Sequence, residues 1–345
     1  LPQVWMTGVT PPRRGPVSSR LNPVKDLVPA PSDRLDPADE NRQPGVLPEP
    51  GQAAPEPGSG QPGARTGRVR VVTVAYNPGD ELERFLVSLA DATSREMAVV
   101  IADNGEEHDV VETVAAAHGA RVIGDGVNRG YGGGANLAAQ GLAEDWIVVA
   151  NPDLVWRPGS LDVLIDAAIA HPEAGALGPR LLNEDGTVYP SGRALPSLTA
   201  GTGHALLGRV WPSNPFSARY HGGNEDVTHA VGWLSGACLL LPADVWRELG
   251  GFDDGYFMFF EDVDLGARVG ALGKVNLQVP EAVVVHEQGA SWKARPERMI
   301  RAHHASARRY MSASHPAPWQ APLRWALSGG LRAREEIAVR AARRG

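Results

Sequence analysis

The strongest constraint on the fold is an alternation of apolar runs and helical segments that begins at Val69. Four short runs rich in Val, Ile and Ala have the composition of buried strands: residues 69–74, 98–102, 120–123 and 146–150. The segments between them are predicted to be helices: residues 80–92, 109–118 and 135–143. This alternation predicts an α/β fold with a mostly parallel central sheet flanked by helices on both faces.

Polar residues follow three of these predicted strands directly. The first strand is followed by Tyr76-Asn77, the second by Asp103-Asn104, and the fourth by Asn151-Pro152-Asp153. Ligands of open α/β sheets bind outside the carboxyl ends of the strands. We therefore expect these side chains to lie on one rim and to form part of a binding site.

The pattern becomes less regular after Asp153. Residues 190–224 are rich in Pro and Gly and are predicted to be loops that shape a cleft for a second substrate, the acceptor. One strand is predicted over residues 231–241, a helix from about residue 261 to Gly273, and two strands over residues 274–279 and 282–286. Within the strand-like run, the single cysteine Cys238 is expected to be part of the core.

Both ends of the chain differ in composition from its centre. Residues 1–67 are rich in Pro, Gly, Ala and charge and are predicted to be a disordered tail, or equally an over-extended gene start. Residues 68–292 are predicted to be the catalytic domain, and residues 293–345 a basic helical segment.

The C-terminal segment carries twelve Lys or Arg against three Glu, a formal charge of +9, so the remainder of the −7 chain carries −16. Trp319 and Trp325 lie among its arginines. A basic segment with interfacial aromatic residues favours attachment to a membrane surface. The alternatives are a solvated helical face or a basic disordered tail.

Bulk properties exclude several classes. A net charge of −7 argues against a nucleic-acid binder. A single cysteine allows no disulfide within the chain, which fits a reducing cytosol. No apolar run approaches the roughly 20 residues that span a bilayer, and the first residues lack the layout of a signal peptide. The catalytic body is therefore expected to be soluble and cytoplasmic.

The Gly-rich stretch of residues 128–136 contains Gly130-x-Gly132-x-x-Ala135, a formal match to a dinucleotide-binding fingerprint. That fingerprint should follow the first strand directly, whereas two strand–helix units precede it here. A loop that packs against a donor nucleotide is the favoured interpretation, and a simple turn at a helix start is the alternative.

Three acids follow an aromatic cluster at Phe260-Glu261-Asp262-Val263-Asp264. Glu261 and Asp264 are three residues apart and would share a helix face, with Asp262 pointing elsewhere. Acids at a helix start are also favoured by the helix dipole alone. The preceding aromatic residues nevertheless suggest a partly desolvated carboxylate, which suits a general base. His286 follows a Val-rich strand, a position where histidine is more often structural than a ligand.

Taken in order, these motifs resemble those of the inverting glycosyltransferases with the GT-A fold. More narrowly, the chain is similar to actinobacterial rhamnosyltransferases that act on N-acetylglucosaminyl-diphospho-polyprenol, over roughly residues 69–330. The resemblance rests on Tyr76-Asn77-Pro78-Gly79, Asp103-Asn104-Gly105, Asn128-Arg129-Gly130-Tyr131-Gly132, Asn151-Pro152-Asp153, Trp233-Leu234-Ser235-Gly236, Glu261-Asp262-Val263-Asp264 and Ala321-Pro322-Leu323-Arg324-Trp325.

The resemblance implies a role for each motif. Asp262 matches the catalytic base of a Glu-Asp pair that includes Glu261. Asp153 matches the last acid of a metal-binding Asp-x-Asp, in which Asn151 replaces the first acid, and His286 matches a second metal ligand. Trp233, Ser235 and Gly236 are assigned to the acceptor. Contacts with the donor, including the pyrimidine-side acid Asp103, are assigned to Tyr76, Asn77, Asp103, Asn104, Asn128, Gly130, Tyr131, Gly132, Asn136 and Asn151.

The implied reaction is a direct displacement that uses a divalent cation, Mg or Mn. The implied donor is dTDP-L-rhamnose, and the acceptor is a polyprenyl-diphosphate-linked GlcNAc at the inner face of the cytoplasmic membrane, in cell-wall linker synthesis. Galactofuranose or a hexose such as glucose or mannose would use similar machinery. A nucleotidyltransferase would want a basic loop near the first strand, and residues 76–80 contain no Lys. A non-catalytic partner that binds sugar nucleotides is the remaining alternative.

Overall fold

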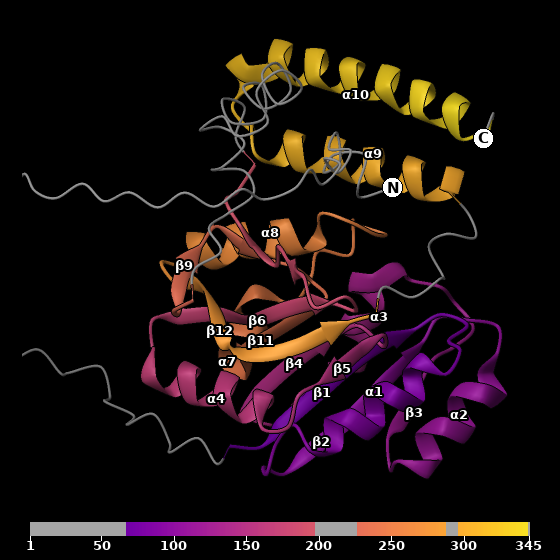
Figure 1. Ribbon diagram of the computed structural model, residues 1–345. Helices are drawn as coiled ribbons and strands as arrows, with labels where there is room; N and C mark the ends of the chain where they lie inside the picture. The colour runs from indigo at the N-terminus through magenta and orange to yellow at the C-terminus, as the bar shows by residue number, and fades with distance from the viewer. Residues whose placement is uncertain (1–66, 197–225, 288–295, 344–345) are drawn as a thin grey trace, which may run out of the picture. The chain divides into compact units, whose positions relative to one another are not determined.

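The structure is a computed structural model that describes residues 67–196, 226–287 and 296–343, all within one compact unit (Figure 1). The predicted N-terminal tail, apart from Gly67, and most of the predicted acceptor loops over residues 190–224 lie outside the described residues.

The first half of the described chain forms the predicted parallel sheet. Its strands are β1 (Val69–Ala75), β2 (Met97–Asp103), β3 (Arg121–Ile123) and β4 (Trp146–Ala150), and they lie in the order β3-β2-β1-β4. Each neighbouring pair in this set is parallel. Helices α1 (Glu81–Ala90) and α2 (His108–Ala117) connect the first three strands, as the apolar periodicity predicts.

Alternate side chains of β1 enter two separate hydrophobic cores. Val69 and Val71 pack with residues of α1, α2 and α4 (Ser160–Ala170) on one face of the sheet. Val72 and Val74 pack with residues of α3 (Gly130–Ala138), α7 (Ala243–Leu249) and α8 (Glu261–Ala271) on the other. Because strand side chains alternate between the two faces, a continuous apolar run is what a sheet covered on both sides requires.

The second half extends the sheet with mixed pairing. Strand β11 (Cys238–Pro242) is antiparallel to β4 and to β6 (Ala174–Asn183), and β12 (Val275–His286) is parallel to β6. The edge strand β5 (Leu154–Trp156) is antiparallel to β12, and the short β7 (Val188–Tyr189) pairs with β6. The sheet is therefore parallel through its first four strands and mixed beyond them.

Two predictions about strands were wrong. Residues 231–241 are not one strand: the chain forms β9 (His229–Val231), β10 (Trp233–Leu234) and β11. Strand β9 pairs with β12, whereas β10 pairs with β8 (Gly192–Arg193), so the chain changes partner at Gly232. A Cβ at Gly232 would meet the backbone of Ala194 and Leu195, which only glycine avoids. Conversely, the two strands predicted over residues 274–286 form the single strand β12, with a register irregularity between Val279 and Val283.

The third helix also differs from its prediction, because it begins at Gly130 and ends at Ala138 rather than covering residues 135–143. Glycine lowers helix propensity, so a sequence rule starts the helix after the glycines. The structure explains their presence. Gly130 has φ 74°, and a Cβ there would collide with the carbonyl of Phe257. The helix start therefore lies directly against the chain that leads into α8.

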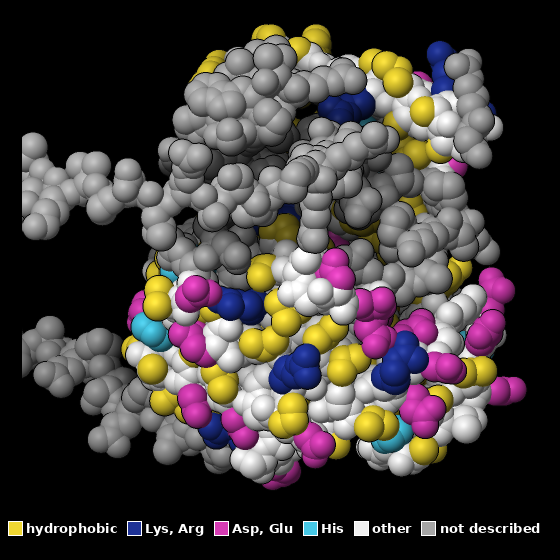
Figure 2. All heavy atoms as spheres, viewed as in Figure 1, with side chains coloured by type: hydrophobic (Ala, Val, Ile, Leu, Met, Phe, Trp, Pro, Cys, Tyr) yellow, Lys and Arg dark blue, Asp and Glu magenta, His cyan; other side chains and the backbone are white. Residues whose placement is uncertain are grey.

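The C-terminal segment is helical, as predicted, and consists of α9 (Pro296–Ala313), η3 (Pro318–Gln320) and α10 (Ala321–Ala342). Helices α9 and α10 lie side by side (Figure 1), joined by ion pairs that include Arg308–Glu335 at 2.6 Å. Trp319 and Trp325 are 78% and 79% exposed. Hydrophobic side chains are visible over these helices at the top of Figure 2. Within the described ranges, no helix is both long enough and apolar enough to span a membrane.

Candidate active site

The carboxyl ends of β1 and β2 are joined by a compact hydrogen-bond network. The Asn104 N–H donates to the carbonyl of Ala75 at 2.9 Å, and Asp103 Oδ1 accepts the N–H of Gly105 at 2.9 Å. Asn77, in the left-handed region at φ 46°, accepts the N–H of Glu106 through Oδ1 at 2.7 Å. Tyr76 directly precedes it and is half-buried. Tyr76, Asn77, Asp103 and Asn104, which are predicted to contact the sugar-nucleotide donor, therefore lie at one rim of the sheet, as expected.

The ring of His108 is a neighbour of Asp103 that sequence analysis did not identify. Its Nδ1 hydrogen-bonds Asp103 Oδ2, and this bond raises the pKa of His108. His108 lies in the first turn of α2, five residues beyond Asp103, and no sequence pattern distinguishes it from the other nine histidines. A buried carboxylate with an exposed basic partner can hold a polar ligand at this rim.

The Gly-rich segment is fastened to the same rim. Asn104 Nδ2 donates to the carbonyl of Gly130 at 2.8 Å, and Asn128 Oδ1 accepts the N–H of Gly130 at 2.9 Å. The Tyr131 hydroxyl donates to the carbonyl of Gly236 at 2.5 Å, and burial raises the pKa of Tyr131 well above its usual range. Gly132 packs on Phe252. The start of α3 thus connects the rim of β2 with the chain around Gly236.

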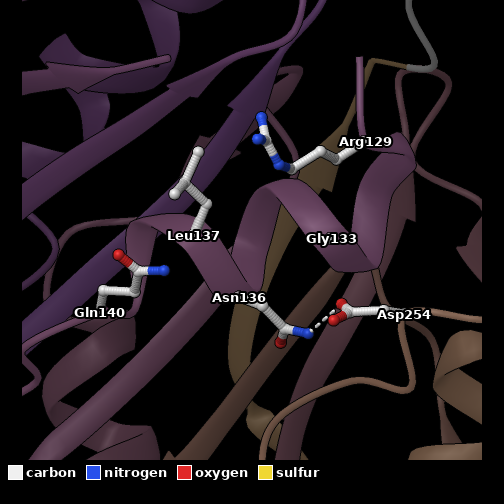
Figure 3. A pocket seen from close by; sticks show the side chains of 6 residues that line it. All are labelled: Arg129, Gly133, Asn136, Leu137, Gln140 and Asp254. Carbon is white, nitrogen blue, oxygen red and sulfur yellow. Dashed lines mark hydrogen bonds between the residues drawn. The ribbon is translucent and has the colours of Figure 1, made fainter. Parts of the chain in front are cut away.

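Asn136 lies elsewhere on the same helix and its amide is fully engaged. Nδ2 donates to the carbonyl of Phe252 at 2.8 Å and to Asp254 Oδ1 at 2.7 Å, and Oδ1 accepts the N–H of Phe252 at 2.9 Å. It lines an open pocket of about 400 Å³ with Arg129, Gly133, Leu137, Gln140 and Asp254 (Figure 3). Its predicted contact with the donor stays a prediction, and the structure assigns its amide to holding the 252–254 loop.

The Glu261-Asp262 pair forms the first turn of α8, where Glu261 is buried and Asp262 is half-buried. Glu261 is 6% exposed, and burial together with the neighbouring Asp262 charge raises its pKa to about 8. Burial also raises the pKa of Asp262. Asp262 Oδ2 accepts the N–H of Gly236 at 2.9 Å, and Oδ1 accepts the N–H of Val263 at 2.8 Å. Two adjacent desolvated carboxyls with raised pKa values are suited to proton transfer near neutral pH.

Asp264 is in a different environment from Glu261, although a shared helix face was expected. Its carboxylate pairs with Arg268 at 2.7 Å, and Arg268 also donates to the carbonyls of Leu249 and Gly251. Asp264 therefore belongs to a structural network that holds α7 and α8 together.

A strained turn delivers Asp262 to its position. Phe259 and Phe260 both have φ 68°, a left-handed conformation that costs a non-glycine residue on the order of 1 kcal/mol or more. Helix α9 supports this turn: the Ser306 hydroxyl donates to the carbonyl of Met258 at 2.8 Å, and the His303 ring lies 5.5 and 5.4 Å from the two phenylalanine rings. The C-terminal segment therefore contributes directly to the construction of this site.

Asp153, Asn151 and His286 converge at the ends of β4 and β12. His286 Nε2 lies 3.3 Å from Asp153 Oδ1 and 3.5 Å from Asn151 Nδ2. Carboxylate, amide and imidazole groups are all able to ligate a divalent cation. The residues described include no cluster of three or more His, Cys, Asp or Glu that could hold a metal alone. The side chains of Asp153, Asn151 and His286 therefore fit a cation that takes further oxygen ligands from a substrate, as Mg²⁺ commonly does.

Comparison with known proteins shows the family to which the chain belongs. Residues 70–236 match the family described as glycosyl transferase family 2. The N-acetylglucosaminyl-diphospho-decaprenol L-rhamnosyltransferase of Mycobacterium tuberculosis is 43% identical, over 79% of this chain and 94% of its own length. The chain belongs to glycosyl transferase family 2. It is a glycosyltransferase, and the predicted GT-A fold class is confirmed.

A more distant relative also has the name of a rhamnosyltransferase. Rhamnosyltransferase WbbL of Escherichia coli is 24% identical over 71% of this chain and 92% of its own length. A crystal structure of GalNAc-T7 with UDP, GalNAc and Mn2+ matches with a TM-score of 0.48 and 15% identity, over 65% of this chain and 44% of that one.

In this glycosyltransferase, the three predicted acceptor residues lie on the chain from β10 to β11, and Gly236 among them contacts Asp262. A Cβ at Gly236 would lie 3.3 Å from Asp262 Cβ and 3.5 Å from the Tyr131 ring, so Gly236 is enclosed between them. The Ser235 N–H donates to the carbonyl of Ser191 at 2.7 Å. Trp233 Nε1 donates to the carbonyl of Ala194 at 3.0 Å. The chain from β10 to β11 is thus held beside Asp262 through Gly236.

Arg193, on β8, is a buried charged residue whose field reaches Asp262, and sequence analysis did not identify it. It is 9% exposed, and its charge lowers the pKa of Asp262, against the larger effect of burial. Its guanidinium carbon lies 5.2 Å from the centroid of the Trp233 ring. Sequence offered no signal, because Arg193 falls in a Pro- and Gly-rich passage predicted to be loop.

Proposed function

We propose that this glycosyltransferase transfers L-rhamnose from dTDP-L-rhamnose to the GlcNAc of a polyprenyl-diphosphate-linked acceptor. The observation that carries the proposal is the 43% identity to the mycobacterial enzyme of that name, which extends over 94% of its length. The matched regions are long enough to include both the donor rim and the Glu261-Asp262 pair, so correspondence of both substrates is the simplest expectation.

In the proposed reaction, Asp262 is the general base. It takes the proton of an acceptor hydroxyl, whose oxygen then attacks the anomeric carbon, displaces the nucleoside diphosphate and inverts the configuration. Burial raises the pKa of both Asp262 and Glu261, which supports this role because a base with a raised pKa binds the transferred proton more tightly. The hydrogen bonds from the Gly236 and Val263 N–H groups would hold both carboxylate oxygens in place, and each oxygen keeps a further lone pair that can accept the proton.

A divalent cation is part of the proposal. Asp153, His286 and the Asn151 amide would hold it, and when bound it would neutralise charge on the departing diphosphate. The 3.3 and 3.5 Å separations among these side chains support a shared ligand site. The two oxygen-bearing side chains and the imidazole of His286 are ligands that fit both Mg²⁺ and Mn²⁺.

The proposed donor site is the rim of β1 and β2 together with the start of α3. Asp103, held by Gly105 and His108, would contact the pyrimidine, and Asn77, Asn104 and Tyr76 would complete the surface. The Gly-rich segment at the start of α3 would cover the donor and exclude water, which otherwise competes as acceptor.

Peripheral attachment to the inner face of the cytoplasmic membrane is proposed for the C-terminal segment. Its support is the +9 charge of residues 293–345 and the exposure of Trp319 and Trp325, which suit an anionic lipid surface. A lipid-linked acceptor would then be presented next to a catalytic domain that has no spanning helix among its described residues.

The test is a panel of nucleotide sugars with Mg²⁺ or Mn²⁺ and polyprenyl-diphosphate-GlcNAc, followed by mass spectrometry of the lipid. The expected result is a gain of one deoxyhexose with dTDP-L-rhamnose alone. Transfer from UDP-galactofuranose or a UDP-hexose would overturn the rhamnosyl assignment, and release of pyrophosphate would indicate nucleotidyl transfer instead.

A further inference from the structure

Arg193 carries a buried charge that the described structure leaves without a direct counter-ion. Its Nε donates to the carbonyl of Pro190 at 2.8 Å, but its Nη2 is buried and has no hydrogen-bond partner. Among the described residues, Arg193 forms no ion pair either. A buried cation with an unsatisfied donor is costly, so a side chain of this kind is commonly completed by a ligand.

Two aromatic rings fix the guanidinium in place. Its central carbon lies 5.7 Å from the Tyr189 ring centroid and 5.2 Å from that of Trp233. Such cation–π contacts, with the Nε bond to Pro190, restrict the plane of the group before any ligand arrives. A preorganised planar guanidinium is the side chain best matched to phosphate oxygens.

The strand pairing of Arg193 brings its guanidinium toward the chain that contacts Asp262, the proposed base. Arg193 pairs with Trp233 in the two-stranded β8–β10 sheet, and the chain from Trp233 reaches Gly236, which hydrogen-bonds Asp262. The effect of Arg193 on the pKa of Asp262 agrees with this proximity. Both the departing nucleoside diphosphate and the diphosphate of a lipid-linked acceptor would come near this corner.

We infer that Arg193 binds a substrate diphosphate, donating through its Nη groups to phosphate oxygens next to the catalytic base. The inference rests on the proposed glycosyl transfer between two diphosphate-bearing substrates. The competing explanation is that Arg193 serves only as a distant counter-ion of Asp262.

The acceptor experiment compares GlcNAc joined to one short prenyl chain through a diphosphate and through an uncharged ether. The measured quantity is the ratio of the two kcat/KM values in wild type, Arg193→Gln and Arg193→Lys. If the lipid diphosphate is the ligand, Arg193→Gln reduces this ratio by about 10- to 100-fold, the worth of hydrogen bonds to a charged group. Arg193→Lys keeps the charge without the planar fork and loses less.

The donor experiment needs no turnover. Calorimetric titration measures the affinity of each variant for dTDP against thymidine, and for UDP against uridine. If the donor diphosphate is the ligand, Arg193→Gln weakens nucleoside diphosphate binding by about 10- to 100-fold and leaves nucleoside binding unchanged. Because these ligands carry no sugar, this comparison still decides the inference if the rhamnosyl assignment fails.

Arg180→Gln is the matched control, since Arg180 pairs with the exposed Asp226 at 2.7 Å. Arg193→Gln should unfold at the wild-type temperature or above it, because a buried, unpartnered charge is removed. A change in either ratio supports the inference and identifies the source of the diphosphate. Unchanged ratios in both experiments overturn it, as does an equal loss for every ligand with a lower unfolding temperature.

Discussion

Two acidic regions of this glycosyltransferase differ in what surrounds their carboxyl groups. At the end of β4, Asp153 lies 3.3 Å from the imidazole of His286, with an amide, Asn151, as the third neighbour. At the start of α8, the buried Glu261 and the half-buried Asp262 are neighbours of each other and directly follow the strained Phe259–Phe260 turn. Asp153 has neutral or basic side chains as neighbours, whereas Glu261 and Asp262 each have another acid as neighbour.

These surroundings favour different chemistry. Burial opposes the ionisation of both carboxyls: together with the charge of Asp262 it raises the pKa of Glu261 to about 8, and it raises the pKa of Asp262 as well. Such a pair is suited to holding and releasing a proton. Oxygen and nitrogen ligands that converge without a second acid are suited to a cation that also binds phosphate. Removing a carboxylate from each region should therefore have different consequences.

The largest effect is expected for Asp262→Asn, which keeps the shape of the side chain and removes the base. We expect kcat to fall by about 10²- to 10⁴-fold, the usual contribution of a positioned base, with little change in donor affinity. Steady-state kinetics and dTDP titration measure the two quantities. Asp264→Asn is the control on the same helix, and a similar loss there would contradict the assignment of the base.

Asp153→Asn should instead act through the cation. With Asn already at 151, this change leaves no carboxylate among the three converging side chains, and we expect Mn²⁺ affinity to fall on the order of 100-fold. Electron paramagnetic resonance of free Mn²⁺, with dTDP present, measures binding without turnover. Asp109→Asn, on the exposed start of α2, is the control. Unchanged Mn²⁺ binding would remove Asp153 from the metal site.

Asn151→Asp sharpens the same comparison in the opposite direction. A second carboxylate near Asp153 should raise Mn²⁺ affinity by roughly 10-fold, because hard cations favour charged oxygen ligands. The same titration tests it, and turnover at saturating Mn²⁺ should change much less. If Asn151→Asp weakens binding, the Asn151 amide has another role, such as its contact with His286.

The parallel half of the sheet could be predicted from sequence because each strand is a continuous apolar run that enters two cores. Val69 to Val74 illustrate this, since alternate residues pack on opposite faces. Because the strands could be predicted, the positions of their carboxyl ends could be predicted too, and with them those of Asp103, Asn104 and the 151–153 motif. Strands β9, β10 and β11 could not be separated, because their division depends on which distant strand each one meets.

Tertiary contacts decide the features that sequence analysis missed. The start of α3 at Gly130 depends on the close approach of Phe257, which no local propensity encodes. The buried Arg193 packs against the rings of Tyr189 and Trp233, which come from other strands. The Phe259–Phe260 turn depends on Ser306 and His303 of α9, more than forty residues away along the chain. Each is a long-range arrangement of residues that are individually unremarkable.

The smallest expected effect concerns stability, and it tests the like-charge surroundings of α8 directly. The folded-state pKa of Glu261 is about 8, above its ordinary value of 4.5, so the folded chain holds a proton that the unfolded chain releases. The stability contributed by this protonated group is present at low pH and is lost as pH rises toward 8. Glu261→Gln stays neutral, so its unfolding temperature should fall less between pH 5 and pH 8 than that of wild type, by a few degrees. Thermal unfolding at both pH values measures this difference, with the exposed Glu106→Gln as control. An equal fall in wild type and Glu261→Gln would mean that Glu261 is ionised in the folded protein, and the contrast between the two acidic regions would then be lost.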